Sequence, residues 1–215
     1  SMRNENRKIA KIDVEIIDKD TPFLLPTMVY KLLIEKNEHS KTITKEGLDL
    51  KKLEKSVNNN DFVQKSEVFV SVDGVLKAVV KQKTPVGREV LETGSFYVDY
   101  EGNRMPLSEN YSARVPLVSG KIDAVENEKL SEVLKMIYED DFLKKNIIGV
   151  QVVPNGSLIM QNRNYDYTID FGKIINIDRK FKNYKAFFQK AVSDSTLNNY
   201  KKINLKFTQQ VVCIK

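Results

Sequence analysis

Cysteine and histidine, which carry much of protein catalysis and metal binding, are almost absent from this sequence. Its 215 residues include one cysteine, Cys213, and one histidine, His39. A single cysteine excludes a disulfide within the chain and a cysteine-based zinc site. His39 stands in a polar stretch beside Glu38 and Ser40, which is typical of an exposed loop. No phosphate-binding glycine loop, serine-nucleophile motif or His-Glu-x-x-His motif is present either. We therefore predict neither a metal nor a cofactor.

Carboxylate pairs remain as candidates for acid–base chemistry. Asp166 and Asp170 point to one face of a predicted strand, and the rise of a strand separates them by about 13 Å. That is wider than the separation of paired glycosidase carboxylates, so we interpret both as part of a solvated face. Asp140-Asp141 follows a predicted helix and is typical of a surface turn. The sequence thus indicates a protein that is not an enzyme.

Charge and hydropathy exclude two further classes. The 35 basic residues are interleaved with 29 acidic ones, and the net charge of +6 therefore indicates a mixed, solvated surface. No segment combines basic residues with aromatic platforms, so we expect no nucleic-acid partner. No run approaches the roughly 20 apolar residues that span a membrane. A serine before the first methionine is typical of a cleaved tag on a truncated chain, so a signal or anchor segment upstream would not be part of this sequence.

The first part of the chain predicts a strand, two helices and a hairpin. Residues 9–17 alternate as a strand does, and Pro26 suits the first turn of a helix. Asp49 is a candidate N-cap for a second helix that ends at the asparagine run 58–60. Asp73-Gly74 then joins two valine-rich strands as a tight turn. These elements predict a small domain over residues 9–84, with two helices on one face of a three-stranded sheet.

The second part, residues 85–215, mixes short strands with helices. Residues 115–118 contain Pro116 and therefore favour an edge or irregular segment over a central strand. The other predicted elements are a strand at 96–98, a helix at 127–140, a hairpin around Pro154-Asn155-Gly156, a strand at 165–171, a helix capped by Asp178 with the apolar face Phe181, Tyr184, Phe188, Ala191 and Val192, and strands at 203–207 and 210–214. The fold class is α+β, with a β domain and flanking helices in this part.

The last strand, residues 210–215, is the one feature with a binding mechanism attached. If it lies at a sheet edge, its free N–H and C=O groups form a template for a strand from a partner. If it lies between neighbours, it has no such role, and the sequence leaves both possibilities open. In the first case, we expect proline in place of Val212 to remove an N–H from the free edge and to abolish strand addition.

Four segments together resemble a known family. Residues 61–86 form a helix end, a strand, the Asp73-Gly74 turn and a return strand that closes on Lys83-Thr84-Pro85. The segment from Phe96 to Ser108 contains an aromatic-Val-Asp-x-x-Gly pattern, and a Pro-x-x-x-Gly pattern runs from Pro116 to Gly120. Residues 203–212 are similar to a closing hairpin. In this order the segments resemble the FtsQ/DivIB family of bacterial cell-division proteins, the first of them its POTRA domain. The lysine- and asparagine-rich style resembles the Bacteroidota branch.

The resemblance implies a POTRA-like domain before the β domain. It also implies a single-pass protein of the inner membrane, with the region given by this sequence in the periplasm. It implies a non-catalytic scaffold of the divisome that binds FtsB- and FtsL-like proteins by strand addition, and other septal proteins through the POTRA domain. A peptide-binding chaperone module of envelope assembly is the alternative that the same domain allows. The family's partner-binding positions fall on Lys206, Phe207, Gln210, Val211, Val212, Cys213, Ile214 and Lys215. Lys206-Phe207 departs from the family's Arg-Tyr pair and lacks both the bidentate guanidinium and the phenol hydroxyl.

Overall fold

The computed structural model describes residues 9, 11–18, 20–35, 49–207 and 209–215, and it divides into two compact units. The first unit comprises Ser1–Lys83 together with Ser108–Ala113, and the second comprises Thr84–Leu107 and Arg114–Lys215. His39 and the start of the chain lie outside the described residues. The α+β class predicted from the sequence is confirmed.

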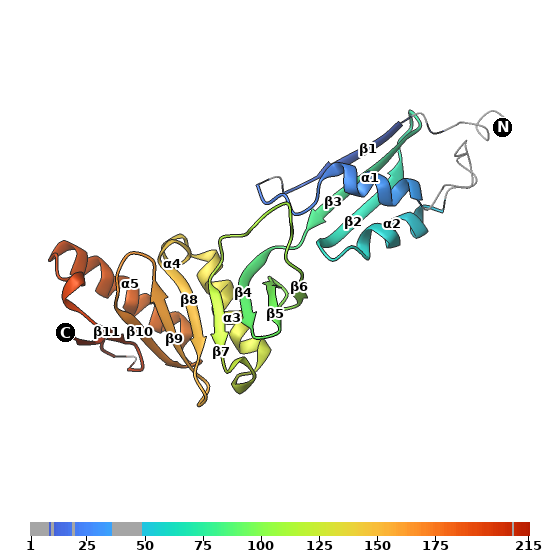
Figure 1. The fold of residues 1–215 in the computed structure, drawn as a ribbon. Coiled ribbons are helices and arrows are strands. Elements are labelled where there is room, and N and C mark those ends of the chain that lie inside the picture. Colours follow the sequence, from blue (N-terminus) through green and yellow to red (C-terminus); the bar gives the residue numbers. More distant parts are fainter. Residues whose placement is uncertain (1–8, 10, 19, 36–48, 208) are drawn as a thin grey trace. The chain divides into compact units, whose positions relative to one another are not determined.

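The first unit is a three-stranded sheet with two helices on one side (Figure 1). Its elements are β1 (Lys11–Ile16), α1 (Pro26–Glu35), α2 (Leu50–Asn58), β2 (Val63–Val70) and β3 (Val75–Gln82). The strand order is β1-β3-β2, with β1 parallel and β2 antiparallel to β3. The predicted order of strand, helix, helix, strand and strand is therefore confirmed.

Local signals in the sequence explain these elements. Pro26 is the first residue of α1, where its missing N–H has no helical partner to lose. The side chain of Asp49 accepts a hydrogen bond from the Lys52 N–H and caps α2, as predicted. Gly74 has a φ of +85°, which the turn between β2 and β3 requires. The helices bury Leu33, Leu53 and other apolar side chains against the sheet.

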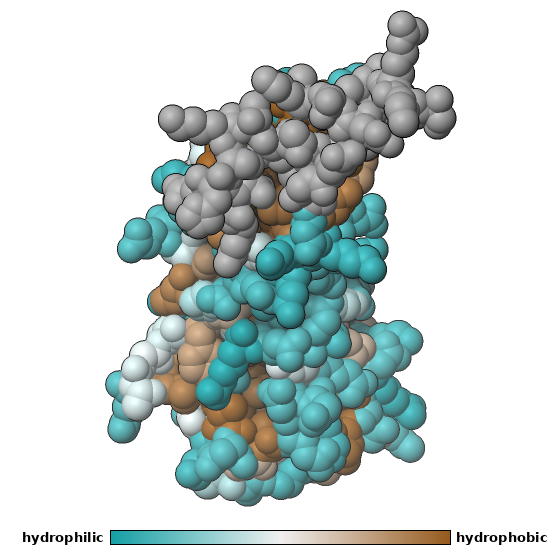
Figure 2. Space-filling view, turned by 90° about the vertical axis from the view of Figure 1, so that its right-hand side faces the viewer, coloured by the Kyte–Doolittle hydropathy of each residue, from teal (hydrophilic) through white to brown (hydrophobic). Residues whose placement is uncertain are grey.

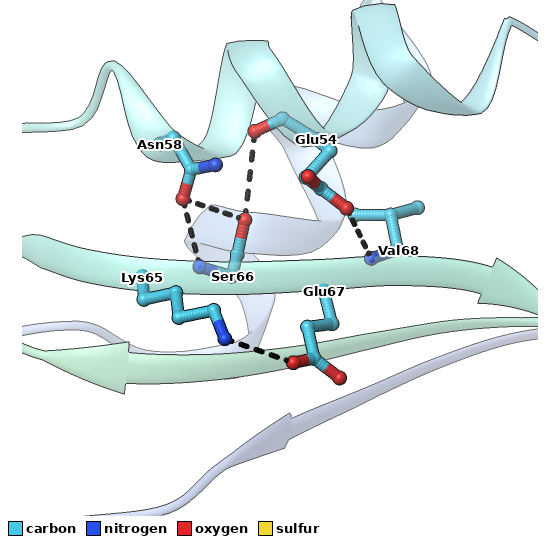
Figure 3. A network of polar contacts seen from close by, with 6 residues as sticks. All are labelled: Glu54, Asn58, Lys65, Ser66, Glu67 and Val68. Atoms are coloured by element: carbon cyan, nitrogen blue, oxygen red, sulfur yellow. Dashed lines mark hydrogen bonds and ion pairs between the residues drawn. The ribbon is translucent and has the colours of Figure 1, made fainter.

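Polar side chains of α2 occupy the outer edge of β2 (Figure 3). The Asn58 side-chain oxygen accepts bonds from the Ser66 N–H at 2.7 Å and from the Ser66 hydroxyl at 2.9 Å. A Glu54 carboxylate oxygen accepts from the Val68 N–H at 3.2 Å. These bonds satisfy N–H groups that an edge strand would otherwise leave to solvent or to another strand.

The second unit is built on a nine-stranded sheet in the order β12-β11-β10-β9-β8-β7-β4-β5-β6. Its elements are β4 (Pro85–Leu91), β5 (Gly94–Asp99), β6 (Arg104–Met105), β7 (Leu117–Gly120), the 3₁₀ turn η1 (Ile122–Ala124), α3 (Asn127–Glu139), α4 (Asp141–Asn146), β8 (Ile147–Val152), β9 (Ser157–Asn162), β10 (Thr168–Lys173), α5 (Ile177–Ser193), the 3₁₀ turn η2 (Leu197–Asn199), β11 (Lys202–Asn204) and β12 (Val212–Ile214). Side chains of α3, α4 and α5 pack with alternate strand residues into one core. The opposite side of the sheet is partly exposed, as at Val90 and Leu117.

The prediction that residues 115–118 form an edge or irregular segment is wrong. β7 lies inside the sheet, parallel to both β4 and β8. Pro116 stands just before β7, so the ladder loses no N–H to it. Its carbonyl instead accepts a bond from the Arg88 N–H at 2.9 Å.

Two expectations about helix starts also need correction. Asp140-Asp141 is not a surface turn, because the Asp140 side chain accepts from the Leu143 N–H at 3.0 Å and caps α4. Asp178 does not cap α5. That helix begins at Ile177 after Asn176, whose φ is +52°, and Asp178 lies in its first turn, 2.7 Å from Lys182 in an ion pair. Both differences arise because capping depends on backbone direction, which residue type alone does not determine.

The apolar face predicted for α5 is confirmed for Phe181, Tyr184 and Ala191, which are buried, and Phe188 packs partly buried against the core. Val192 is 48% exposed and does not belong to that face. The strand predicted over 165–171 begins later, at Thr168, so Asp166 lies outside it.

We expect Leu53→Asp to unfold the first unit. Leu53 is 2% exposed in its core, so the substitution removes apolar burial and places a carboxylate in an apolar site. The loss of unfolding free energy should be about 4 kcal/mol or more. Lys51→Asp, on the exposed side of the same helix, is the matched control and should leave denaturant unfolding nearly unchanged. Equal effects of the two substitutions would contradict the assigned core.

A buried pair of tyrosines predicts a loss of stability at alkaline pH. The Tyr167 and Tyr184 hydroxyls are 2.8 Å apart, and the Asn162 amide donates to Tyr184 at 2.9 Å. Burial raises the pKa of both phenols above the usual value of 10.0.

In the unfolded chain the two phenols ionise near pH 10, whereas in the folded chain they stay protonated. Their contribution to stability is therefore complete below pH 10 and decreases as the pH rises above it. Urea unfolding between pH 8 and 11 should show this decrease, and Tyr167→Phe should make it shallower; an unchanged slope would refute the assignment.

Candidate partner-binding site

Exposed hydrophobic side chains do not select a single surface. On the face shown in Figure 2, hydrophobic residues form separate patches between hydrophilic ones. Several elements contribute exposed residues, from Ile17 near the start of the chain to Ile214 near its end. The part of the chain that the structure describes also contains no group of three or more His, Cys, Asp or Glu side chains that could hold a metal ion. The backbone at the sheet edges is therefore the more informative feature.

β12 is the last strand at one end of the nine-stranded sheet, and among the described residues it pairs only with β11. Its register is antiparallel, with Lys202 opposite Ile214, Ile203 opposite Cys213 and Asn204 opposite Val212. β11 in turn is parallel to β10. One side of β12 consequently carries backbone groups that no described strand uses.

Hydrogen bonds of β11 show which backbone groups of β12 face outward. The Leu205 N–H donates to the Asp170 carbonyl of β10 at 2.9 Å, so the groups of Lys202 and Asn204 point the other way, to β12. The Lys201 N–H donates to the Ile214 carbonyl at 2.8 Å, which confirms that Ile214 faces β11. Since backbone direction alternates along a strand, Val212 also faces β11 and Cys213 directs its N–H and C=O to the free edge.

This geometry changes the mutation expected from the sequence. Proline in place of Val212 would remove an N–H that faces Asn204 inside the sheet, and it would therefore loosen β12 itself. The N–H at the free edge belongs to Cys213. A one-residue difference matters here because it exchanges the two sides of the strand.

The side chains of the terminal segment divide between the core and the solvent. Val211 and Cys213 are half-buried against the core of the second unit, and burial raises the pKa of the Cys213 thiol. Val212 and Ile214 are 37% and 52% exposed, and Phe207 is 53% exposed. Gln210 and Lys215 are exposed as well. Cys213 is thus a packing residue whose backbone lies at the edge.

Lys206 contacts two residues of β10, and no pattern in the sequence indicates these contacts. Its ammonium lies 2.8 Å from a carboxylate oxygen of Asp170, whose side chain is only 14% exposed. The expectation that Asp170 belongs to a solvated face is therefore wrong. The stem of Lys206 crosses Gly172, where a Cβ would lie 2.7 Å from the Lys206 Cγ. The backbone of Gly172, with a φ of +74°, belongs to a bulge opposite β9.

A buried lysine fixes the end of β10. Lys180 of α5 is 2% exposed, and its ammonium donates to the carbonyls of Phe171 at 2.9 Å and Lys173 at 2.7 Å. Burial lowers the pKa of Lys180, while the charge of nearby Asp170 acts to raise it. Asp170 and Gly172 thus contact the start of the segment that leads from β11 to β12, and Lys180 holds the strand that carries them. No motif in the sequence indicates this, because the three residues meet only in the folded sheet.

We expect Asp170→Asn to weaken this attachment. The substitution removes the charge opposite Lys206 but keeps the side chain's shape, so the loss in unfolding free energy should be about 1 kcal/mol. Asp178→Asn removes an ion pair with both side chains well exposed and should change stability by less than about 0.5 kcal/mol. Urea unfolding of both variants checks the difference. A loss no larger for Asp170→Asn than for Asp178→Asn would mean that the Lys206 contact does not hold the segment.

Comparison with known proteins agrees with the sequence resemblance. Residues 84–214 match the family described as FtsQ/DivIB, C-terminal related, and this range covers more than half of the chain. No curated protein matches the sequence. Among the described residues, no helix is long and apolar enough to cross a membrane. The matched range contains the whole nine-stranded sheet, including β12. The chain belongs to the FtsQ/DivIB C-terminal related family, a family of cell-division proteins.

Proposed function

We propose that this protein is a non-catalytic scaffold of the bacterial divisome that binds FtsB- and FtsL-like division proteins by adding a strand to β12. Family membership supports a role in cell division. The observation that carries the proposal further is the free edge of β12 at the end of the sheet. A partner strand would accept a hydrogen bond from the Cys213 N–H and donate a hydrogen bond to the Cys213 carbonyl.

Exposed side chains around this edge would add apolar and polar contacts to the backbone hydrogen bonds with the partner strand. Phe207, Val212 and Ile214 are apolar and about 37–53% exposed, so an added strand with apolar residues could bury them. Lys206, Gln210, Val211 and Lys215 complete the proposed contact set. The ion pair with Asp170 leaves the Lys206 ammonium engaged, so we assign Lys206 chiefly to positioning the segment.

The remaining parts of the proposal follow the family. We propose that the natural protein has a single membrane anchor upstream of residue 1 and that the described part lies in the periplasm. The first unit, with its order of strand, helix, helix, strand and strand, would be a POTRA-like domain that contacts other septal proteins.

The test compares Cys213→Pro with Cys213→Ala. Proline removes the N–H at the free edge and leaves the groups that face β11 intact, whereas alanine keeps the N–H and removes only the thiol. Calorimetry measures the affinity of each variant for the extracytoplasmic FtsB–FtsL pair of the same genome. We expect the proline variant to bind this pair at least about tenfold more weakly. Alanine should change the affinity by no more than about threefold.

Far-UV circular dichroism and the melting temperature of both variants serve as controls for folding. If the proline variant is folded and binds as tightly as the unmodified protein, β12 is not the docking strand. If the unmodified protein itself does not bind the pair, the proposed partners are wrong.

A further inference from the structure

The sheet of the first unit has two edges, and they differ in how they are protected. At the β2 edge, Asn58 and Glu54 of α2 accept the N–H groups of Ser66 and Val68 (Figure 3). At the other edge, β1 pairs only with β3 in the described part of the chain. Because an unprotected edge is a template for another strand, β1 is the edge at which a partner could add.

The outward groups of β1 follow from one hydrogen bond. The Ile17 N–H donates to the Val80 carbonyl of β3 at 3.0 Å. Backbone direction alternates, so Glu15 and Asp13 also face β3, and the N–H and C=O groups of Val14 and Ile16 point away from it. A strand lying beside β1 could therefore bond to Val14 and Ile16 without displacing any bond to β3.

A groove of about 510 Å³ runs beside these residues. Four successive residues of β1, from Asp13 to Ile16, line it together with Pro22, Leu24, Leu25 and Pro26 from the connection to α1. Gln82 holds that connection in place, since its side-chain oxygen accepts from the Leu24 N–H at 2.8 Å and its amide donates to the Asp18 carbonyl at 2.7 Å. The groove thus has an edge strand along one side and an apolar wall of proline and leucine.

The charged side chains of the groove all have the same sign. They are Asp13, Glu15 and Asp18, although the whole chain carries a net charge of +6. None of the three forms an ion pair with another residue that the structure describes. Such a rim favours a cationic occupant and disfavours an acidic one.

We propose that the β1 groove binds an extended peptide segment of a partner protein in which apolar residues alternate with lysine or arginine. The alternation follows from the two sides of β1. Val14 and Ile16 turn their side chains to the helix-covered core, so the apolar wall lies on that side. Asp13 and Glu15 point to the opposite side of the sheet, where basic residues of the added strand would lie beside them. This site lies wholly within the first unit and does not depend on the role proposed for β12.

The test uses a fluorescein-labelled octapeptide of alternating valine and lysine. Its control has the same composition in two blocks, four valines followed by four lysines, so that total charge is equal. Fluorescence anisotropy with the full chain at low ionic strength should show saturable binding of the alternating peptide, and the block peptide should bind at least about tenfold more weakly. Equal binding of the two peptides would reduce the site to non-specific charge attraction and overturn the proposal, as would the absence of saturable binding.

Protein variants test the strand and the charges separately. Val14→Pro removes an outward N–H and should lower the affinity at least about tenfold, while the matched Val14→Ala keeps that N–H and should lower it no more than about threefold. Asp13→Asn combined with Glu15→Gln should weaken binding about threefold to tenfold, and Glu67→Gln on β2 should have no effect.

Nuclear magnetic resonance of the unmodified chain gives a readout that needs no variant to fold. Titration with the alternating peptide should shift the amide signals of Val14 and Ile16. Shifts confined to Ser66 and Val68 of β2 would place the peptide at the wrong edge and overturn the proposal, as would full binding by a folded Val14→Pro variant.

Discussion

The binding proposed for this protein depends on the backbone N–H and C=O groups that its edge strands leave unpaired. In the second unit, side chains from three helices pack into one core with the nine-stranded sheet. Another strand can join this sheet only at its end strands, because every interior strand already has a neighbour on both sides. At β12, a single neighbour satisfies the groups of Val212 and Ile214, and the groups of Cys213 remain directed outward. An added strand would satisfy them and bury adjacent apolar side chains, which makes the edge a site of specific binding and also a point that must be held in place.

The contacts behind β12 supply that restraint. Lys206 is anchored to Asp170, its stem lies against Gly172, and Lys180 fixes the end of β10 from beneath. Asp170 and Gly172 lie on β10, two strands from the free edge, and they contact Lys206, which follows β11 in the segment that leads to β12. The first unit manages its edges differently. Side chains of α2 close the β2 edge, while β1 retains an open side and an acidic groove.

The sequence predicted the elements whose signals are local. Pro26, Asp49 and the Asp73-Gly74 turn define the helices and hairpin of the first unit because each acts within a few residues of itself. Long-range arrangement was less accessible. Pro116 suggested an edge, but it lies just outside a strand that is central because β4 and β8 pair with it from distant parts of the chain. The segment Ser108–Ala113 belongs to the first unit although the sequence around it belongs to the second, and no local pattern indicates this.

The candidate site was predictable only in part for the same reason. Alternating apolar residues near the end of the chain indicated a strand there, but which groups face outward depends on pairing with β11 and β10. The direct measurement is hydrogen exchange of the Cys213 amide by nuclear magnetic resonance, without and with the extracytoplasmic FtsB–FtsL pair. We expect the Cys213 amide to exchange at least about tenfold more slowly in the complex, while the amides of Val212 and Ile214 are already protected in the free chain. An unchanged Cys213 exchange rate in a saturated complex would contradict it.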